Sequence, residues 1–199
     1  NDYTWFLRSL LLKLDAWTRD GTLPPESRYP QVVNGTLVEL EALEFPLVPQ
    51  VRRPVNVSRA YRLDYGPEFD TLGIIANEPP EGDTPFPFLV PQVDETGNEI
   101  AGIRSPELAV PLATHAGWNP YSPIASQGSY IPLSRTRSER EATGDSRLSV
   151  EERYASREEY LGLVAGEALS LIEEGNLLGS DLPAILQNAG KHWDYVMGE

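Results

Sequence analysis

Cysteine is absent from this 199-residue chain, and only two histidines and one methionine are present. Without cysteine the chain can have no disulfide scaffold, thiol nucleophile or cysteine-ligated zinc. The histidines, His115 and His192, stand 77 positions apart without any His-x-x-x-His spacing, so we expect no metal site. Neither a G-x-G-x-x-G string nor a P-loop occurs, and we therefore expect no nucleotide or other cofactor.

Basic side chains are also scarce, since 16 lysines and arginines face 30 acidic residues and the net charge is -14. A surface this negative repels phosphate backbones and anionic lipids, so we expect neither nucleic acid nor membrane as a partner. The longest uninterrupted aliphatic run is Leu10 to Leu12, far short of the roughly 20 residues of a membrane span. The 40% apolar content and four tryptophans favour a folded chain. The compartment stays open between the periplasm or exterior and the cytoplasm.

The chain divides into three regions. The first, residues 1–21, is predicted to hold one helix from Tyr3 to Asp20, capped by Asn1 or Asp2 and stopped by Gly21. Its periodicity places an apolar face opposite a polar one, and Trp5 and Leu12 add a second apolar stripe within the polar side. We therefore expect this helix to pack on two partners. The predicted main face consists of Tyr3, Phe6, Leu7, Leu10, Leu14 and Trp17.

Residues 22–146 hold 17 of the 18 prolines, which exclude long helices and central strands and leave short strands and ordered loops. Strands are predicted at 60–65, 86–93 and 99–103, the last two forming a hairpin around Asp94 to Asn98. The charged stretch from Ser134 to Asp145 is predicted to be a solvated linker.

Residues 147–199 are predicted to form a helical hairpin. Ser149 and Glu152 match a capping box, after which one helix is expected to run to about Glu174 and to end at Gly175. Ser180 or Asp181 is expected to cap a last helix, with Pro183 in its first turn.

No complete catalytic motif is present in the sequence. The nucleophile elbow G-x-S-x-G is missing, and the loop serines around Gly144 and Ser126 to Ser129 lack its second glycine. His115 follows an apolar run and is a candidate pocket residue, whereas packing or solvent exposure explains His192. The acidic turn at Asp94 to Glu99 fails the calcium-loop spacing. We predict no catalytic residue and no metal ligand within the chain.

Ordered motifs along most of the chain resemble a known family. They include Leu14-Asp15-Ala16-Trp17, Tyr29-Pro30, Leu89-Val90-Pro91-Gln92-Val93-Asp94, Ala101-Gly102-Ile103-Arg104, Val110-Pro111-Leu112-Ala113-Thr114, Gly117-Trp118-Asn119, Gly128-Ser129-Tyr130-Ile131-Pro132 and Glu151-Glu152-Arg153-Tyr154. Together they resemble the C-terminal portion of a bacterial family of large alpha/beta hydrolase domain proteins.

The resemblance implies that the family's nucleophilic serine and catalytic histidine precede the part matched here. The family position equivalent to His115 is usually tyrosine, which argues against a catalytic imidazole. The resemblance further implies an α+β fragment of an α/β-hydrolase-like fold. Its parts would be a sheet-packing N-terminal helix (1–21), a proline-rich cap or insertion with short antiparallel strands and a β-hairpin (22–146), and two C-terminal helices (147–199).

These expectations combine into one functional hypothesis. The chain is expected to be the C-terminal segment of an esterase-like serine hydrolase, inactive alone, with the rest of the hydrolase domain as its partner and a small ester as substrate. The concentration of aromatic and amide groups points to a pocket wall. The candidate pocket residues are Thr114, His115, Trp118, Asn119, Tyr121, Ser129 and Tyr130.

Two alternatives remain open at this point. The chain could be an independent binding module that uses its proline-rich surface, in which case Trp5 and Leu12 should be buried. It could also be a complete small hydrolase that pairs His115 with Ser126 or Ser129.

Overall fold

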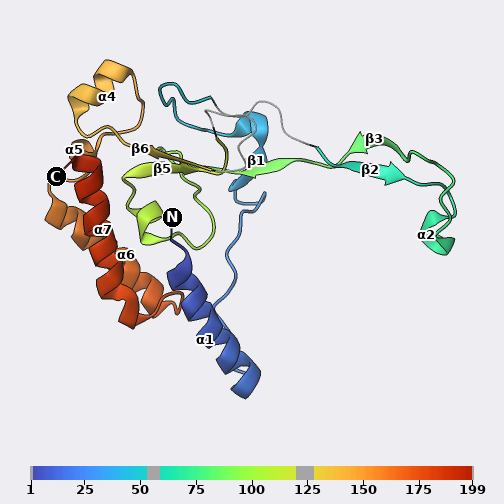
Figure 1. The fold of residues 1–199 in the computed structure, drawn as a ribbon, viewed down its shortest axis with the longest axis horizontal. Helices are drawn as coiled ribbons and strands as arrows, with labels where there is room; N and C mark the ends of the chain where they lie inside the picture. The colour runs from blue at the N-terminus through green and yellow to red at the C-terminus, as the bar shows by residue number, and fades with distance from the viewer. Residues whose placement is uncertain (1, 53–58, 120–127, 199) are drawn as a thin grey trace.

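The computed structural model describes residues 2–52, 59–119 and 128–198. Two long C-terminal helices and a short β-hairpin form the body, while the N-terminal helix and a two-stranded arm extend from it in different directions (Figure 1). In these residues every strand pair is antiparallel, and the strands form three two-stranded sheets. The prediction of a mixed α+β chain with short antiparallel strands is confirmed.

The N-terminal helix, α1 (Thr4–Asp20), has the extent that its periodicity predicts. Asp2 accepts a hydrogen bond from the Thr4 amide at 2.9 Å, as expected of a capping side chain, whereas Asn1 lies outside the described residues. The helix ends where Gly21 adopts the left-handed conformation, with φ of 77°. Trp5 and Phe6 pack against the core, but most of the predicted apolar face is exposed in this chain.

In the first part of the proline-rich region, β1 (Leu37–Glu39) leads into the 3₁₀ turn η1 (Leu40–Ala42) and pairs with β4 (Leu89–Pro91). The predicted hairpin between 86–93 and 99–103 is confirmed only next to its turn. The Asp94 amide donates to the Asn98 carbonyl at 2.8 Å, Val93 and Glu99 form one bridge, and the Ile100 amide donates to the Gln92 carbonyl at 3.1 Å. The strand β4 itself pairs with β1.

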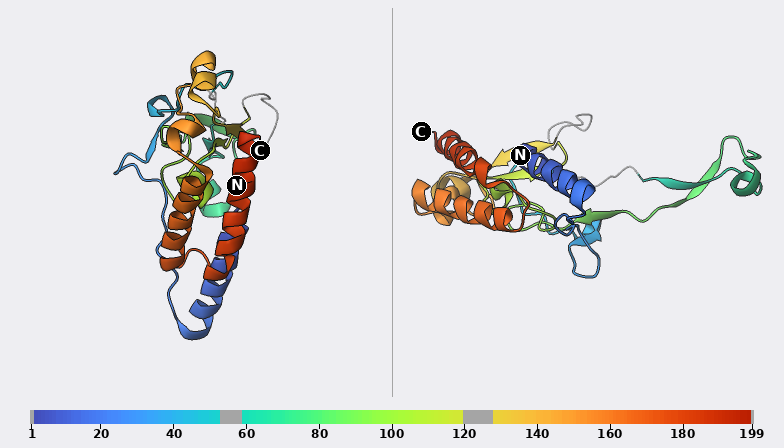
Figure 2. Two further views of the ribbon diagram at one scale, coloured as in Figure 1. Left: turned by 90° about the vertical axis from the view of Figure 1, so that its left-hand side faces the viewer. Right: turned by 90° about the horizontal axis from the view of Figure 1, so that it is seen from below.

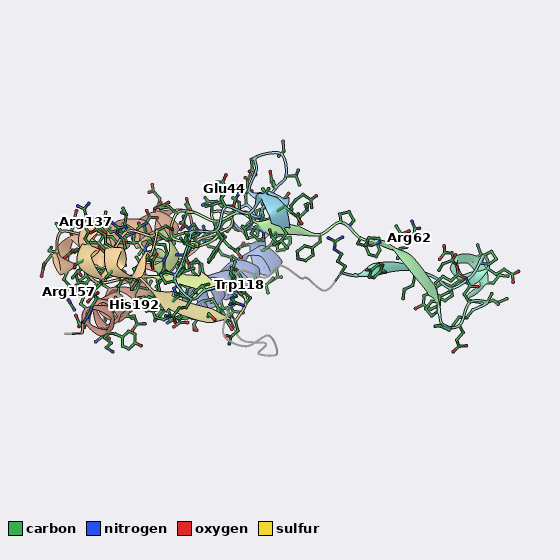
Figure 3. The ribbon with its side chains drawn as sticks, turned by 90° about the horizontal axis from the view of Figure 1, so that it is seen from above. Glu44, Arg62, Trp118, Arg137, Arg157 and His192 are labelled. Carbon is green, nitrogen blue, oxygen red and sulfur yellow. The ribbon has the colours of Figure 1, made fainter. Side chains whose placement is uncertain are left out.

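A second segment of this region forms an arm, which comprises β2 (Tyr61–Asp64), α2 (Phe69–Leu72) and β3 (Glu81–Pro85). The arm reaches away from the helical body, on the side opposite α6 and α7 (Figure 1; Figure 3, near Arg62). The strand predicted at 60–65 is confirmed as β2. Its partner β3 was missed because the segment contains Gly82 and Pro85, which are poor strand residues.

The remaining short elements lie against the C-terminal helices. They are α3 (Pro106–Ala109), β5 (Ala113–Ala116) and β6 (Ser129–Pro132), and the two strands pair with each other. The expected solvated linker at Ser134 to Asp145 is wrong, because it contains α4 (Arg137–Thr143). A capping box between Thr136 and Glu139 starts this helix, and Gly144 ends it.

The C-terminal region is a helical hairpin in which α6 (Arg157–Glu173) packs on α7 (Leu182–Met197), with the 3₁₀ turn η2 (Gly179–Asp181) between them (Figure 2). The capping box of Ser149 and Glu152 is present but starts only the short α5 (Val150–Arg153). The expectation of one continuous helix to Glu174 is therefore wrong. The chain turns extended at Tyr154, and Ser156 caps α6 afresh by accepting from the Glu159 amide.

The hydrophobic core lies between this hairpin, β5–β6 and the segment around α3. Tyr160 and Trp193 stack at its centre with ring centroids 5.3 Å apart, and Tyr154 meets Tyr160 edge to face. The buried core side chains are Val110, Leu112, Leu133, Val150, Tyr154, Tyr160, Val164, Ala168, Leu171, Leu177, Ile185, Ala189, Trp193 and Val196.

A buried arginine joins strands β5 and β6 to the segment between α4 and α5. Arg147, 2% exposed, pairs with Asp145 at 2.6 Å and donates to the Thr114 hydroxyl at 2.7 Å. It also donates to the carbonyls of Ile131 and Pro132 in β6. An arginine can occupy so dry a site because each of these acceptors replaces lost hydration.

Replacing this arginine tests that role. Arg147→Met leaves Asp145 buried without its cation, so we expect the free energy of unfolding in urea to fall by about 3–5 kcal/mol. Arg137→Met is the matched control, because Arg137 is largely exposed and its ion pairs are worth less than about 1 kcal/mol. Equal losses in the two variants would contradict the proposed importance of the buried pair.

Candidate functional site

A pocket of about 510 Å³ opens beside the β5–β6 hairpin. One wall comes from the ends of the two strands, and the other from the loop that leads into α3. Its walls mix apolar, hydroxyl, imidazole and charged groups, which suits a small organic ligand with a few polar atoms. The lining residues are Glu99, Ala101, Ile103, Arg104, Leu108, His115, Ala116, Gly117, Gly128, Ser129 and Tyr130.

Strand register places two of the candidate residues on the same face. His115 of β5 lies directly opposite Tyr130 of β6, and their rings meet edge to face with centroids 5.5 Å apart. Gly128 brings the strands close at the pocket floor, where a Cβ would come within 2.5 Å of the Ala116 carbonyl oxygen. Three candidates predicted from the sequence, His115, Ser129 and Tyr130, are therefore brought together around this pocket.

His115 is held through its backbone, because its amide donates to Asn98 Oδ1 at 2.8 Å. Its Nε2 is buried and has no hydrogen-bond partner among the described residues. Burial lowers the pKa of this imidazole from 6.5 to about 4. The ring is therefore neutral at pH 7.

Tyr130 contacts the other histidine of the chain. Its hydroxyl lies 2.6 Å from Nε2 of His192 on α7, and the two ring centroids are 5.5 Å apart. Burial raises the pKa of Tyr130 to about 12 and lowers the pKa of His192. Both groups are neutral at pH 7, and the direction of their hydrogen bond follows the tautomer of the imidazole: the Tyr130 hydroxyl donates when the proton of His192 is on Nδ1.

His192 was missed from the sequence as a residue near the site. His192 stands 62 residues from Tyr130 in the sequence. Its neighbour Trp193 packs in the core, and this packing accounts for the inward face of the helix without a role for His192. No spacing or motif links the two positions, because α7 reaches β6 only through tertiary packing. The sequence holds no signal that identifies this pair.

The other candidates lie away from the pocket. Thr114 is fully buried on the opposite face of β5, where its hydroxyl donates to the Thr96 carbonyl and accepts from Arg147. Trp118 packs edge to face on Phe45, with centroids 5.1 Å apart. Asn119 follows it and does not line the pocket, and Tyr121 lies outside the described residues. Figure 3 shows Trp118 and His192 well apart.

The geometry gives no support to a Ser129 nucleophile paired with His115. Ser129 lies opposite Ala116 and next to Tyr130, so it occupies the strand face opposite the one that carries His115. In the part of the chain that the structure describes, neither imidazole is hydrogen-bonded to a serine or threonine hydroxyl. Ser126 lies outside that part.

Arg104, a basic residue that lines the pocket, is neutralised by Asp94, with Nη2 2.7 Å from Oδ2. Across the described ranges, no group of three histidine, aspartate or glutamate side chains is arranged to hold a metal ion. Within the same ranges, no helix has the length and apolar character needed to cross a membrane.

The buried neutral state of His115 predicts a pH dependence of stability. Below pH 6.5 the unfolded chain takes up a proton on this side chain, whereas the folded chain does so only near pH 4. The contribution is therefore present above pH 6.5 and is lost as the pH falls from 6.5 to 4. Between pH 7 and pH 5, wild type should lose about 1 kcal/mol more unfolding free energy than His115→Gln. Identical pH dependence in urea titrations of the two proteins would contradict the burial of a neutral imidazole.

Comparison with known proteins identifies the family. A family model described as an alpha/beta hydrolase domain matches residues 2–187. Searches of curated proteins and of solved structures returned no match. The matched range covers nearly the whole chain and confirms the resemblance that the ordered motifs indicated. This chain belongs to the alpha/beta hydrolase domain family.

Proposed function

We propose that this chain is the C-terminal segment of a serine hydrolase that acts on small esters. In this proposal it supplies scaffold and part of the substrate-pocket wall, while the nucleophilic serine and its histidine base belong to the rest of the hydrolase domain. One observation carries the proposal: the described residues form a pocket of about 510 Å³ with polar walls, yet none of their serine or threonine hydroxyls is hydrogen-bonded to an imidazole.

The exposed apolar face of α1 supports the proposal that this helix packs on another part of the hydrolase domain. Leu11 is 67% and Leu12 is 56% exposed, and their neighbours on the helix are similarly uncovered. Soluble proteins rarely expose a contiguous apolar surface of this kind unless it is an interface. The rest of the hydrolase domain is the proposed occupant, since a helix of an α/β fold buries its apolar face against a sheet. The exposed apolar residues of α1 are Tyr3, Leu7, Leu10, Leu11, Leu12, Leu14 and Trp17.

The chemistry of such an enzyme assigns a limited role to this chain. A serine attacks the ester carbonyl, an acyl-enzyme forms and the alcohol leaves, with backbone amides stabilising the oxyanion. The neutral His115 and Tyr130 would contact polar atoms of the ester, while Ile103 and Leu108 would contact its apolar part. These contacts orient the substrate and require no covalent step from this chain.

The independent binding module is the second candidate. The exposed arm favours it, because a two-stranded hairpin with Tyr61, Leu63 and Phe69 uncovered is marginal in water without a partner. This alternative expected both Trp5 and Leu12 to be buried. Trp5 is half-buried against the core, but Leu12 is mostly exposed, which favours the hydrolase segment.

A serine-directed fluorophosphonate probe tests the division of labour. We expect the 199-residue chain to remain unlabelled, because none of its described serine or threonine hydroxyls is bonded to an imidazole base, whereas the whole hydrolase should react at one serine outside this chain. The measurement is mass spectrometry of the labelled peptides. Labelling of Ser126 or Ser129 in the isolated chain would instead establish the complete small hydrolase.

Substitution on α1 tests the docking of this helix. In the isolated chain, Leu11→Gln with Leu12→Gln should change the free energy of unfolding by less than about 0.5 kcal/mol, because both side chains are exposed. In the whole hydrolase the same pair should cost about 3 kcal/mol or more, as two buried leucines are lost. Arg19→Gln, on the polar side of α1, is the control. An unaffected whole hydrolase would contradict docking through this face.

A further inference from the structure

The only two histidines of the chain converge on one tyrosine. Tyr130 lies between His115 of β5 and His192 of α7, with each imidazole centroid 5.5 Å from the phenol ring. Among the described residues, the hydroxyl bonds to His192 alone, at 2.6 Å from Nε2. Since His115 and Tyr130 both line the pocket, this contact links α7, which contributes no lining residue itself, to the pocket wall.

Packing alone does not explain why a histidine occupies this position. The core contact of this part of α7 is made by Trp193, and the helix is further fixed by the Asp194 to Arg157 ion pair at 2.7 Å. Tyr130 is 38% exposed, so the Tyr130 to His192 bond lies at the edge of the body and outside its core. A hydrogen bond made there orients a side chain more than it stabilises the fold.

The direction of this hydrogen bond depends on the proton content of His192. In the neutral Nδ1–H tautomer, Nε2 carries a lone pair and the Tyr130 O–H donates to it. When a proton from solvent binds Nε2, the resulting N–H must donate, and the tyrosine oxygen becomes the acceptor. The phenolic O–H is then free to rotate and donate elsewhere, and Tyr130 is one of the residues that line the pocket.

We propose that His192 is a positioning residue that holds the Tyr130 hydroxyl at the pocket wall and, when protonated, releases its O–H to donate to a ligand oxygen in the pocket. The ligand class is a molecule with a carbonyl or carboxylate acceptor. For its kinetic consequence the inference rests on the proposed hydrolase function, whereas the hydrogen bond and its reversal are properties of this chain. The groups that face the pair are Glu107 of α3, His115 of β5 and Tyr195 of α7.

Nuclear magnetic resonance of the histidine side chains tests the bond directly, because the 199-residue chain has only two imidazoles to assign. In wild type at pH 8, His192 should be the Nδ1–H tautomer, with Nε2 as acceptor. Tyr130→Phe should shift it to a mixture of tautomers and leave His115 unchanged. Tyr195→Phe is the matched control, because it removes the hydroxyl of a neighbouring tyrosine. The ring centroid of Tyr195 lies 6.5 Å from that of Tyr130.

An acid titration of His192 distinguishes a hydrogen bond that reverses its direction from one that keeps it. On acidification the new Nε2–H of His192 should be protected from exchange in wild type and in Tyr195→Phe but exposed in Tyr130→Phe. A His192 tautomer and exchange rate that Tyr130→Phe leaves unchanged would overturn the proposal. So would an Nε2–H tautomer at pH 8, because the tyrosine would then already be the acceptor.

Kinetics of the whole hydrolase with p-nitrophenyl butyrate supply the functional readout. KM should be about fivefold lower at pH 5 than at pH 8, the effect of one added neutral hydrogen bond. His192→Gln can still accept from Tyr130 but does not titrate, so it should keep the high-pH KM throughout, as should Tyr130→Phe. If the KM of His192→Gln varied with pH as the wild-type KM does, the positioning role would be overturned. Absence of ester turnover beside an intact tautomer signature would contradict the proposed hydrolase function alone.

Discussion

The buried guanidinium of Arg147 is the contact on which the pocket geometry depends. It pairs with Asp145 and donates hydrogen bonds to carbonyls of β6. It also donates to the Thr114 hydroxyl, from which the hydrogen-bond network continues. Thr114 donates to the Thr96 carbonyl, and Asn98 in the same turn donates to the Ala113 carbonyl at 2.9 Å and accepts from the His115 amide. A charge in a dry site must be surrounded by acceptors, so the loops that supply them are fixed in place. The position of His115 is one result.

The sequence predicted elements whose signals are local. The extent of α1, the capping box of Ser149 and Glu152, and Pro183 in the first turn of α7 each depend on residues within one or two helical turns, and all are confirmed. The helix α4 was missed because its charged composition resembled a linker. Its stability comes from the Thr136 capping box and from Arg140 bonding to Glu152, and the second of these links residues 12 positions apart.

Strand pairing was predicted less well, for a physical reason. The Asp94 to Asn98 turn signal was correct, yet β4 pairs with β1, about 50 residues earlier, and β3 forms around Gly82 and Pro85. Partner choice among short strands depends on tertiary contacts that a turn motif does not encode. The site shows the same limit. His115, Ser129 and Tyr130 were predicted and do line one pocket, whereas the contact of His192 with Tyr130 joins residues 62 positions apart and has no sequence signature.

The exposed apolar surfaces of α1 and of the arm lie farther from the stable core than the pocket does. Tyr160, Trp193 and Val164 close the core without help from the α1 leucines or the arm, so loss of a partner at those surfaces need not unfold the body. The pocket lies between the two zones: on the core side Arg147 donates to the carbonyls of β6, while at the outer edge Tyr130 is held by its hydrogen bond to His192. A change at that edge, such as a proton on His192, alters which groups face a ligand while the buried network beneath stays intact. The chain can therefore change the polarity of its pocket at little cost in stability.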